Sequence, residues 1–243
     1  MITTSNSNDS MKKTARGAGI LYLILFFIGP FAYLISKSGI IVPGDAAATA
    51  GNLMASESVF RMGLATETVI FLIEIALSAI LYVLLRPVSR PLALAAAFAR
   101  LAEAFLQAVN LIPSAAALLL ADGNGYLRAF EATQRDALAM LFHDINAFVI
   151  LLWGLVFGFH LLLLGYLVFK SGFWPKVLGI LLLIASAGYL AQSYAHIIAP
   201  QYDAILSTVV IVVTVPGELA FTVWLLWKGL NTEKWTQRAL EAV

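Results

Sequence analysis

Six long runs of apolar residues, separated by short polar links, dominate the hydropathy pattern. They cover residues 17–36, 62–85, 91–121, 138–169, 175–198 and 204–227. About 20 apolar residues, each rising 1.5 Å, cross a hydrocarbon core of about 30 Å. The pattern therefore predicts an all-α polytopic bundle of six transmembrane helices. The third and fourth runs are longer than one perpendicular crossing needs, so we expect a bend at Pro113 and a projection or tilt of the fourth helix.

Composition supports a membrane environment. Hydrophobic residues make up 61% of the chain and charged residues 12%, and the mean hydropathy is +0.89. The lipid bilayer is thus the expected partner. The net charge of +1 gives no reason to expect a nucleic acid. Because the chain contains no cysteine, disulfides and thiolate metal sites are excluded.

Positive residues are unevenly divided between the two sets of links. One set carries Lys12, Lys13, Arg16, Arg86, Arg90, Lys170, Lys176, Lys228, Lys234 and Arg238, whereas the other has only Lys37, Arg61, Arg128 and Arg135, mixed with acids. Lys and Arg are retained on the cytoplasmic side of membranes. We therefore predict a multi-pass protein of the cell membrane, a bacterial inner membrane, with both termini cytoplasmic.

We expect three parts in the chain, and two of the links inside the transmembrane part are long enough to carry structure. We expect a disordered polar tail at 1–11, the transmembrane domain at 12–230 and a short cytoplasmic tail at 231–243. Pro43, Gly44 and Asp45 predict a turn and an N-cap for a short surface helix at 46–55. In the second link, 122–137, a glycine-rich turn leads into a lid or a helical extension.

Polar residues inside the spans recur at helical spacing. Arg100, Glu103, Gln107 and Asn110 follow at steps of three, four and three, which places them on one face of the third span. Four of the other five spans carry similar stripes, formed by Glu67 and Glu74, by His143, Asn146, Trp153 and His160, by Tyr189, Gln192 and His196, and by Thr214, Glu218 and Thr222. Such residues are costly in lipid and must face the bundle interior or water.

Counting residues from the basic links sorts these side chains by depth. An inner layer about 15–20 Å from those links contains the candidate coupling residues Glu74, Arg100, Glu103, His160 and Glu218. An outer vestibule at about 24–40 Å contains Glu67, Asn110, His143, Asn146, Gln192 and His196. The sequence thus predicts a vestibule above a buried charge cluster.

The inner layer is not balanced in charge. Three carboxylates accompany one guanidinium, so at least one acid is expected to be protonated or to share a cation. The cluster then serves either as a proton or cation site or only as polar contacts that fix helix register. Pro216 and Gly217 before Glu218 predict a break in the last helix beside this carboxylate.

The outer layer raises a metal hypothesis. His143, His196 and either Glu67 or Asp144 could supply nitrogen and oxygen ligands to zinc, with a position left open for water. No His-Glu-x-x-His motif is present, so no metal site is assigned and no cofactor is predicted, with zinc kept as an alternative. Gly154 and Gly158 form a Gly-x-x-x-Gly pair, which indicates close helix packing within one chain or in a homo-oligomer.

Several segments resemble a known family. They are 42–46, the stripe from Arg100 to Asn110, 157–167, 170–173 and 216–224. In order and spacing they are similar to a bacterial membrane-protein family known as domain of unknown function 4386, and the resemblance extends from Lys12 to Trp235. It implies a six-span protein and supplies no reaction. Arg100, Glu103, His160 and Glu218 lie in the segments that match, whereas His143 and His196 do not.

Three functions follow as alternatives, so the sequence does not decide whether the protein is an enzyme. The first is a small proton- or cation-coupled transporter or permease that uses the midplane carboxylates. The second is a membrane-embedded, metal-dependent hydrolase with an outward-facing site of His and carboxylate residues. The third is a non-catalytic membrane scaffold whose polar stripes only fix packing.

Overall fold

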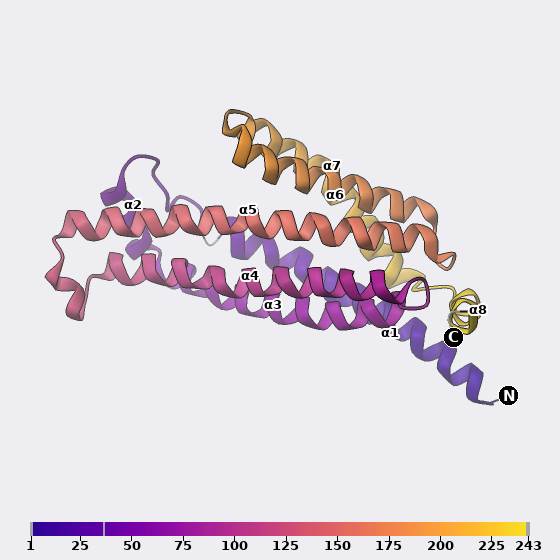
Figure 1. Ribbon diagram of the computed structural model, residues 1–243. Helices are drawn as coiled ribbons and strands as arrows, with labels where there is room; N and C mark the ends of the chain where they lie inside the picture. The colour runs from indigo at the N-terminus through magenta and orange to yellow at the C-terminus, as the bar shows by residue number, and fades with distance from the viewer. Residues whose placement is uncertain (1, 36, 242–243) are drawn as a thin grey trace. The chain divides into compact units, whose positions relative to one another are not determined.

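The structure, a computed structural model, describes residues 2–35 and 37–241, in which every regular element is helical (Figure 1). The elements are α1 (Ile2–Pro30), η1 (Phe31–Ile35), α2 (Ala46–Ala55), α3 (Glu57–Leu85), α4 (Arg90–Asp122), η2 (Gly125–Ala129), α5 (Ala132–Ser171), α6 (Lys176–Ile198), η3 (Pro200–Tyr202), α7 (Asp203–Trp227) and α8 (Thr232–Glu241). The predicted all-α fold is confirmed.

Six helical stretches are long and apolar enough to cross a membrane, as predicted. They are Ser10–Leu34, Glu57–Leu85, Arg90–Asp122, Ala132–Ser171, Lys176–Ile198 and Ile205–Trp227. The predicted end of the first span, Ser36, lies outside the described residues. At 1.5 Å per residue the 40 residues of α5 exceed one perpendicular crossing, as expected.

Pro113 and Pro216 do not interrupt their helices. α4 continues through Pro113 to Asp122, and α7 continues through Pro216 to Trp227. The predicted break beside Glu218 is therefore wrong. Gly217 has another role, because a β-carbon there would lie 2.8 Å from the carbonyl oxygen of Leu181. Glycine at this position lets α7 approach the backbone of α6.

The chain packs as two compact units. The first unit takes its residues from Met1–Ile24, Ile73–Ala104 and Trp153–Val243, and the second from Leu25–Leu72 and Phe105–Leu152. Within the first unit α6 and α7 lie side by side (Figure 1).

Glycines on α5 bring α6 close to it inside the first unit. A β-carbon at Gly158 would lie 3.1 Å from Cβ of Tyr189, and one at Gly154 would lie 3.1 Å from Oγ of Ser193. The Gly-x-x-x-Gly pair therefore serves packing within one chain. A homo-oligomer stays a prediction, and it would need a surface other than the one that α6 covers.

The basic links meet at one end of the first unit. Arg16 donates to the carbonyl of Trp227 at 3.0 Å, and the indole of Trp174 donates to that of Gly229 at 2.8 Å. This end gathers the residues that predict a cytoplasmic face, and the orientation itself stays a prediction. The tail predicted at 231–243 contains α8, although residues 242–243 lie outside the described residues. At the other terminus α1 begins at Ile2, and disorder of residues 1–11 stays a prediction.

The second unit contains the predicted short helix. α2 spans Ala46–Ala55, and the carboxylate of Asp45 caps it by accepting from the amide of Ala48 at 2.9 Å. The helix does more than cover a surface, since Leu53 packs in an apolar cluster with Phe60. In the other link, glycines with positive φ at 123 and 125 form the predicted turn. A 3-10 segment then precedes α5.

Candidate functional site

Arg100 is the centre of the buried charges in the first unit. Its side chain on α4 is 2% exposed, and its Nε lies 3.0 Å from Oε1 of Glu103, one turn along the helix. The two atoms are at ion-pair distance, but their alignment is too poor for a hydrogen bond. Nη1 of Arg100 and Oε2 of Glu103 also have no hydrogen-bond partner among the described residues. The pair is therefore desolvated and incompletely satisfied.

Two aromatic rings enclose the guanidinium. Its central carbon lies 5.3 Å from the ring centroid of Tyr22 on α1 and 5.3 Å from that of Phe157 on α5. A cation within about 6 Å of an aromatic face is attracted to it, most strongly where water is excluded. The two rings therefore add a cation–π attraction to the attraction that the carboxylates exert on the guanidinium.

Two further carboxylates interact with this cation from other helices. Glu74 on α3 and Glu218 on α7 both act electrostatically on Arg100, in addition to Glu103. Glu218 accepts a hydrogen bond from the Tyr189 hydroxyl at 3.2 Å. Oε2 of Glu74 is buried and has no hydrogen-bond partner among the described residues. Three acids thus attract one guanidinium, and among the described residues only Glu103 lies at ion-pair distance from it.

His160 completes the group with a defined tautomer. Its Nδ1 lies 2.9 Å from the carbonyl oxygen of Ala96. A carbonyl only accepts, so Nδ1 carries the proton in this contact, and in the neutral ring Nε2 keeps a lone pair. Nε2 is buried and lacks a hydrogen-bond partner in the described part of the chain. The ring also stacks on Phe157 at a centroid distance of 6.1 Å.

The five inner-layer residues predicted from the sequence therefore meet in the first unit. We call them the Arg100 cluster: Glu74, Arg100, Glu103, His160 and Glu218. Their functional role stays a prediction. Sequence reasoning missed the enclosing rings of Tyr22 and Phe157, because both were counted as apolar. Depth gave no signal for Tyr22, since it lies six residues beyond Arg16, about 9 Å from the basic link and short of the depth of Arg100.

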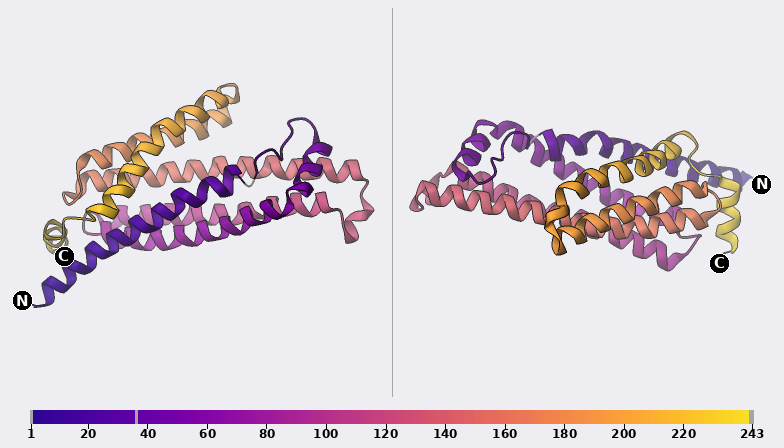
Figure 2. Two further views of the ribbon diagram at one scale, coloured as in Figure 1. Left: turned by 180° about the vertical axis from the view of Figure 1, so that it is seen from behind. Right: turned by 90° about the horizontal axis from the view of Figure 1, so that it is seen from above.

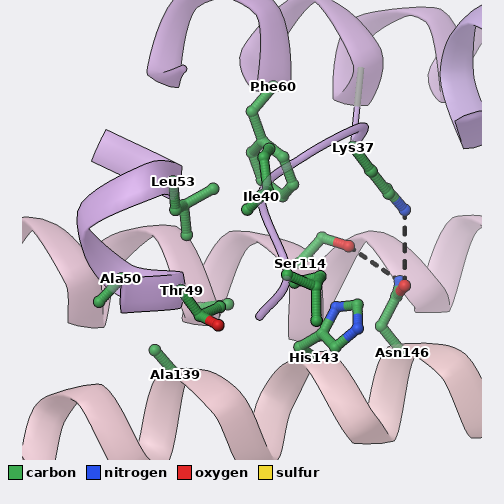
Figure 3. Close-up of a pocket in the computed structure, with 12 residues that line it drawn as sticks. Lys37, Ile40, Thr49, Ala50, Leu53, Phe60, Ser114, Ala139, His143 and Asn146 are labelled. Carbon is green, nitrogen blue, oxygen red and sulfur yellow. Dashed lines mark hydrogen bonds between the residues drawn. The ribbon is translucent and has the colours of Figure 1, made fainter. Parts of the chain in front are cut away.

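A second polar network occupies the second unit (Figure 3). Lys37 Nζ lies 3.1 Å from Oε1 of Glu67 and donates to Oδ1 of Asn146 at 3.4 Å. The other carboxylate oxygen of Glu67 accepts from the Gln107 amide at 3.3 Å. Sequence reasoning missed Lys37 as a partner because it was counted only as a charge outside the membrane. Unlike the Arg100 cluster, this network pairs one acid with one cation.

Asn146 links this network to a small cavity. Its amide nitrogen donates to the Ser114 hydroxyl at 2.9 Å and to the Asn110 carbonyl at 3.3 Å. The cavity provides about 20 Å³ for the centre of a water-sized sphere, which is room for about one water. Figure 3 shows His143 and Asn146 at one side of it and Leu53 of α2 at another.

The predicted outer vestibule is divided between the units. Glu67, Asn110, His143 and Asn146 belong to the second unit, whereas Gln192 and His196 belong to the first. The Gln192 amide donates to the Ser207 hydroxyl at 3.2 Å. Among the described residues no group of three His, Cys, Asp or Glu side chains is arranged to hold a metal ion. The zinc hypothesis for Glu67, His143 and His196 thus gains no support and stays a prediction.

Comparison with known proteins yields two matches. A family model described as "Domain of unknown function (DUF4386)" matches residues 17–229. An uncharacterized protein of Archaeoglobus fulgidus is 39% identical over 89 residues, which cover 36% of this chain and 51% of that relative. The match thus spans about half the length of the relative. No solved structure matches the chain.

Proposed function

The chain belongs to the DUF4386 family of six-span membrane proteins, and from its buried charges we propose that it is a small proton- or cation-coupled transporter. The Arg100 cluster is the proposed coupling site. The observation that carries the proposal is that three carboxylates, Glu74, Glu103 and Glu218, act on one buried guanidinium. A protein that needed only polar contacts to fix helix register would need fewer acids.

Charge balance explains why such a site would exchange protons or cations. One ionised carboxylate neutralises Arg100, and each further ionised carboxylate would be an unpaired charge in a medium of low dielectric. The remaining acids must therefore hold protons or share a cation. Ionisable groups of this kind inside a membrane mark proton relays and ion pathways.

The contacts of the acids suggest how a proton would pass from one acid to another. Glu103 lies against Arg100, whereas Glu218 is held by the Tyr189 hydroxyl. If Arg100 moved from Glu103 toward Glu218, a proton would have to pass from Glu218 to Glu103, so that the ionised carboxylate stays beside the guanidinium. Nε2 of His160, an acceptor with no partner among the described residues, is a further position for that proton.

Coupling also requires a helix that can change shape near the site. Pro216 has no amide proton, so the carbonyl one turn before it loses its helical hydrogen bond. This weak point lies two residues before Glu218. The helix is continuous in this structure, and the missing hydrogen bond reduces the energy needed to bend it there.

The proposal can be tested without knowing the substrate. Proteoliposomes adsorbed on a solid-supported membrane would be subjected to a rapid pH jump, and the transient current recorded. We expect a current for the unaltered protein, a strongly reduced one for Glu218→Gln and an unaltered one for the exposed control Glu57→Gln. A jump in sodium or potassium concentration at constant pH shows whether the coupling ion is one of these cations instead of a proton.

Equal currents in protein-containing and empty liposomes would overturn the proposal. The same holds if Glu218→Gln changes thermal stability but not the current, which would favour a scaffold whose polar stripes fix packing only.

A further inference from the structure

A cleft of about 350 Å³ lies at the basic end of the first unit, between the α3–α4 link and α8. Its lining includes Tyr82 of α3, Arg86 and Ser89 of the link, Arg90 at the start of α4, and Trp235 of α8. Its volume is at the lower end of the range of about 300–1,000 Å³ found for small-molecule sites. A compact polar group therefore fits it better than a large ligand.

The cleft is positively charged. Arg86 and Arg90 both line it, and no carboxylate does so. Neither guanidinium forms an ion pair with any residue that the structure describes. Ser89 and Tyr82 add hydroxyl groups to the same lining. Guanidinium groups without a carboxylate partner, together with hydroxyl donors, suit a phosphate.

The position of the cleft points to a lipid. The second span ends at Leu85 and the third begins at Arg90, so the link between them is at the boundary of the hydrocarbon, where lipid phosphates lie. Trp235 is anchored there, because its indole donates to the carbonyl of Leu84 at 2.8 Å. Tryptophan is enriched at this level of membranes.

α8 has the orientation of a helix that lies in the membrane interface. Figure 2 shows it running across the ends of α6 and α7, not along them. Its ten residues separate a polar face with Lys234 and Arg238 from the side that carries Trp235. Helices with this division lie flat among lipid headgroups.

A second groove on the other side of α8 offers a comparison. It has about 300 Å³ and is lined by Lys170, Ser171, Gly172, Lys234, Gln237, Arg238 and Glu241. Here a carboxylate contributes to the lining, and Nη1 of Arg238 lies 3.3 Å from Oε2 of Glu241. The groove has the same net charge as the cleft, but one of its cations is already paired and none of its described lining residues is a tryptophan. The cleft with Arg86, Arg90 and Trp235 is therefore the better site for a lipid phosphate.

We propose that the cleft formed by Arg86, Ser89, Arg90 and Trp235 binds the phosphate of an anionic phospholipid. The guanidinium groups contact the phosphate oxygens, and the indole lies against the glycerol region. Basic pockets beside spanning helices bind anionic headgroups in this way. The leaflet is the one at the basic end of the first unit, for which we predict a cytoplasmic orientation. The proposal does not depend on the Arg100 cluster.

Native mass spectrometry of the full chain, released from a neutral detergent, tests this site. The probes are phosphatidylglycerol, phosphatidylcholine and inorganic phosphate, and the readout is the apparent Kd of each. We expect phosphatidylglycerol to bind most tightly. In R86Q/R90Q its binding should weaken by roughly 30-fold, since each basic residue near an anionic surface contributes about 1 kcal/mol and 1.4 kcal/mol is a factor of ten.

Two variants keep the outcome interpretable. K234Q/R238Q removes the same charge from the neighbouring groove and should bind phosphatidylglycerol within about threefold of the unaltered protein, since Arg238 is already paired with Glu241 and none of the described residues lining that groove is a tryptophan. R86K/R90K preserves the positive charge used for membrane insertion and should bind more tightly than R86Q/R90Q. Equal weakening in both charge-removing variants would overturn the site, as would inorganic phosphate binding as tightly as the lipid or unchanged binding in R86Q/R90Q.

Discussion

Arg100 Nε and Glu103 Oε1 lie 3.0 Å apart, one turn from each other on α4, with side chains that are 2% and 0% exposed. A single helix therefore carries both signs of charge into the interior of the first unit. Such a pair stabilises little relative to apolar residues, but removing one partner leaves the other charge buried. The free energy of unfolding should consequently fall most when one member of the pair is replaced and the other is left charged.

Replacing Glu103 by Gln should reduce the free energy of unfolding by about 3 kcal/mol, because Arg100 then loses its nearest counter-charge in a buried setting. The matched control is Glu57→Gln, which breaks a 2.7 Å pair with Arg61 on an exposed surface and should cost at most about 1 kcal/mol. Thermal denaturation in detergent measures both. Equal losses would show that Arg100 is satisfied by Glu74 and Glu218 without Glu103.

Phe157 should contribute more to the stability of the protein than the packing of its apolar ring alone. Its ring faces the Arg100 guanidinium at 5.3 Å, so Phe157→Leu removes a desolvated cation–π contact as well as aromatic packing. We expect a loss of about 2 kcal/mol. Phe159 on the same helix is 48% exposed, and Phe159→Leu should change stability by no more than about 0.5 kcal/mol. A similar effect of both substitutions would indicate ring packing alone.

The polar stripes were predictable because two constraints act together. Helical periodicity places Arg100, Glu103, Gln107 and Asn110 on one face, and the cost of exposing them to lipid decides that this face is inside. All four are buried in the structure, which confirms their predicted burial. The roles of Tyr22 and Phe157 were not predictable from hydropathy, since an aromatic ring facing a cation and one facing lipid give the same apolar pattern.

Other features depend on tertiary contacts that no local pattern contains. The docking of α8 through Trp235 and Leu84 joins positions 151 residues apart. Lys37 was counted as a charge of an outer link, and only the fold brings it to Glu67. Pro216 and Gly217 led to the wrong prediction of a break because the sequence does not show that Gly217 contacts the backbone of α6.

Gly217→Ala should separate α7 from α6. The added β-carbon would lie 2.8 Å from the carbonyl oxygen of Leu181, and a backbone atom cannot move aside as a flexible side chain can. We expect a loss of about 1–3 kcal/mol. At Gly17 of α1 nothing lies within 4 Å of an added β-carbon, so Gly17→Ala should be neutral or slightly stabilising. Thermal denaturation compares the two variants. An unchanged midpoint for Gly217→Ala would mean that α6 and α7 can move apart to admit the β-carbon at no cost in stability.

Lys37→Met tests whether the second unit depends on its ion pair. Lys37 is 14% exposed and Glu67 is 0% exposed, so removing the ammonium leaves a buried carboxylate whose only remaining hydrogen bond in the described structure is the one from Gln107. We expect a loss of about 3 kcal/mol. Lys37→Met/Glu67→Leu removes both charges and should recover most of it, because an apolar pair needs no counter-charge. Arg61→Met, at a 59% exposed site, should stay within about 1 kcal/mol. If the double substitution is as unstable as Lys37→Met alone, the loss comes from the contact of Lys37 with Asn146, and the Glu67 pair contributes little.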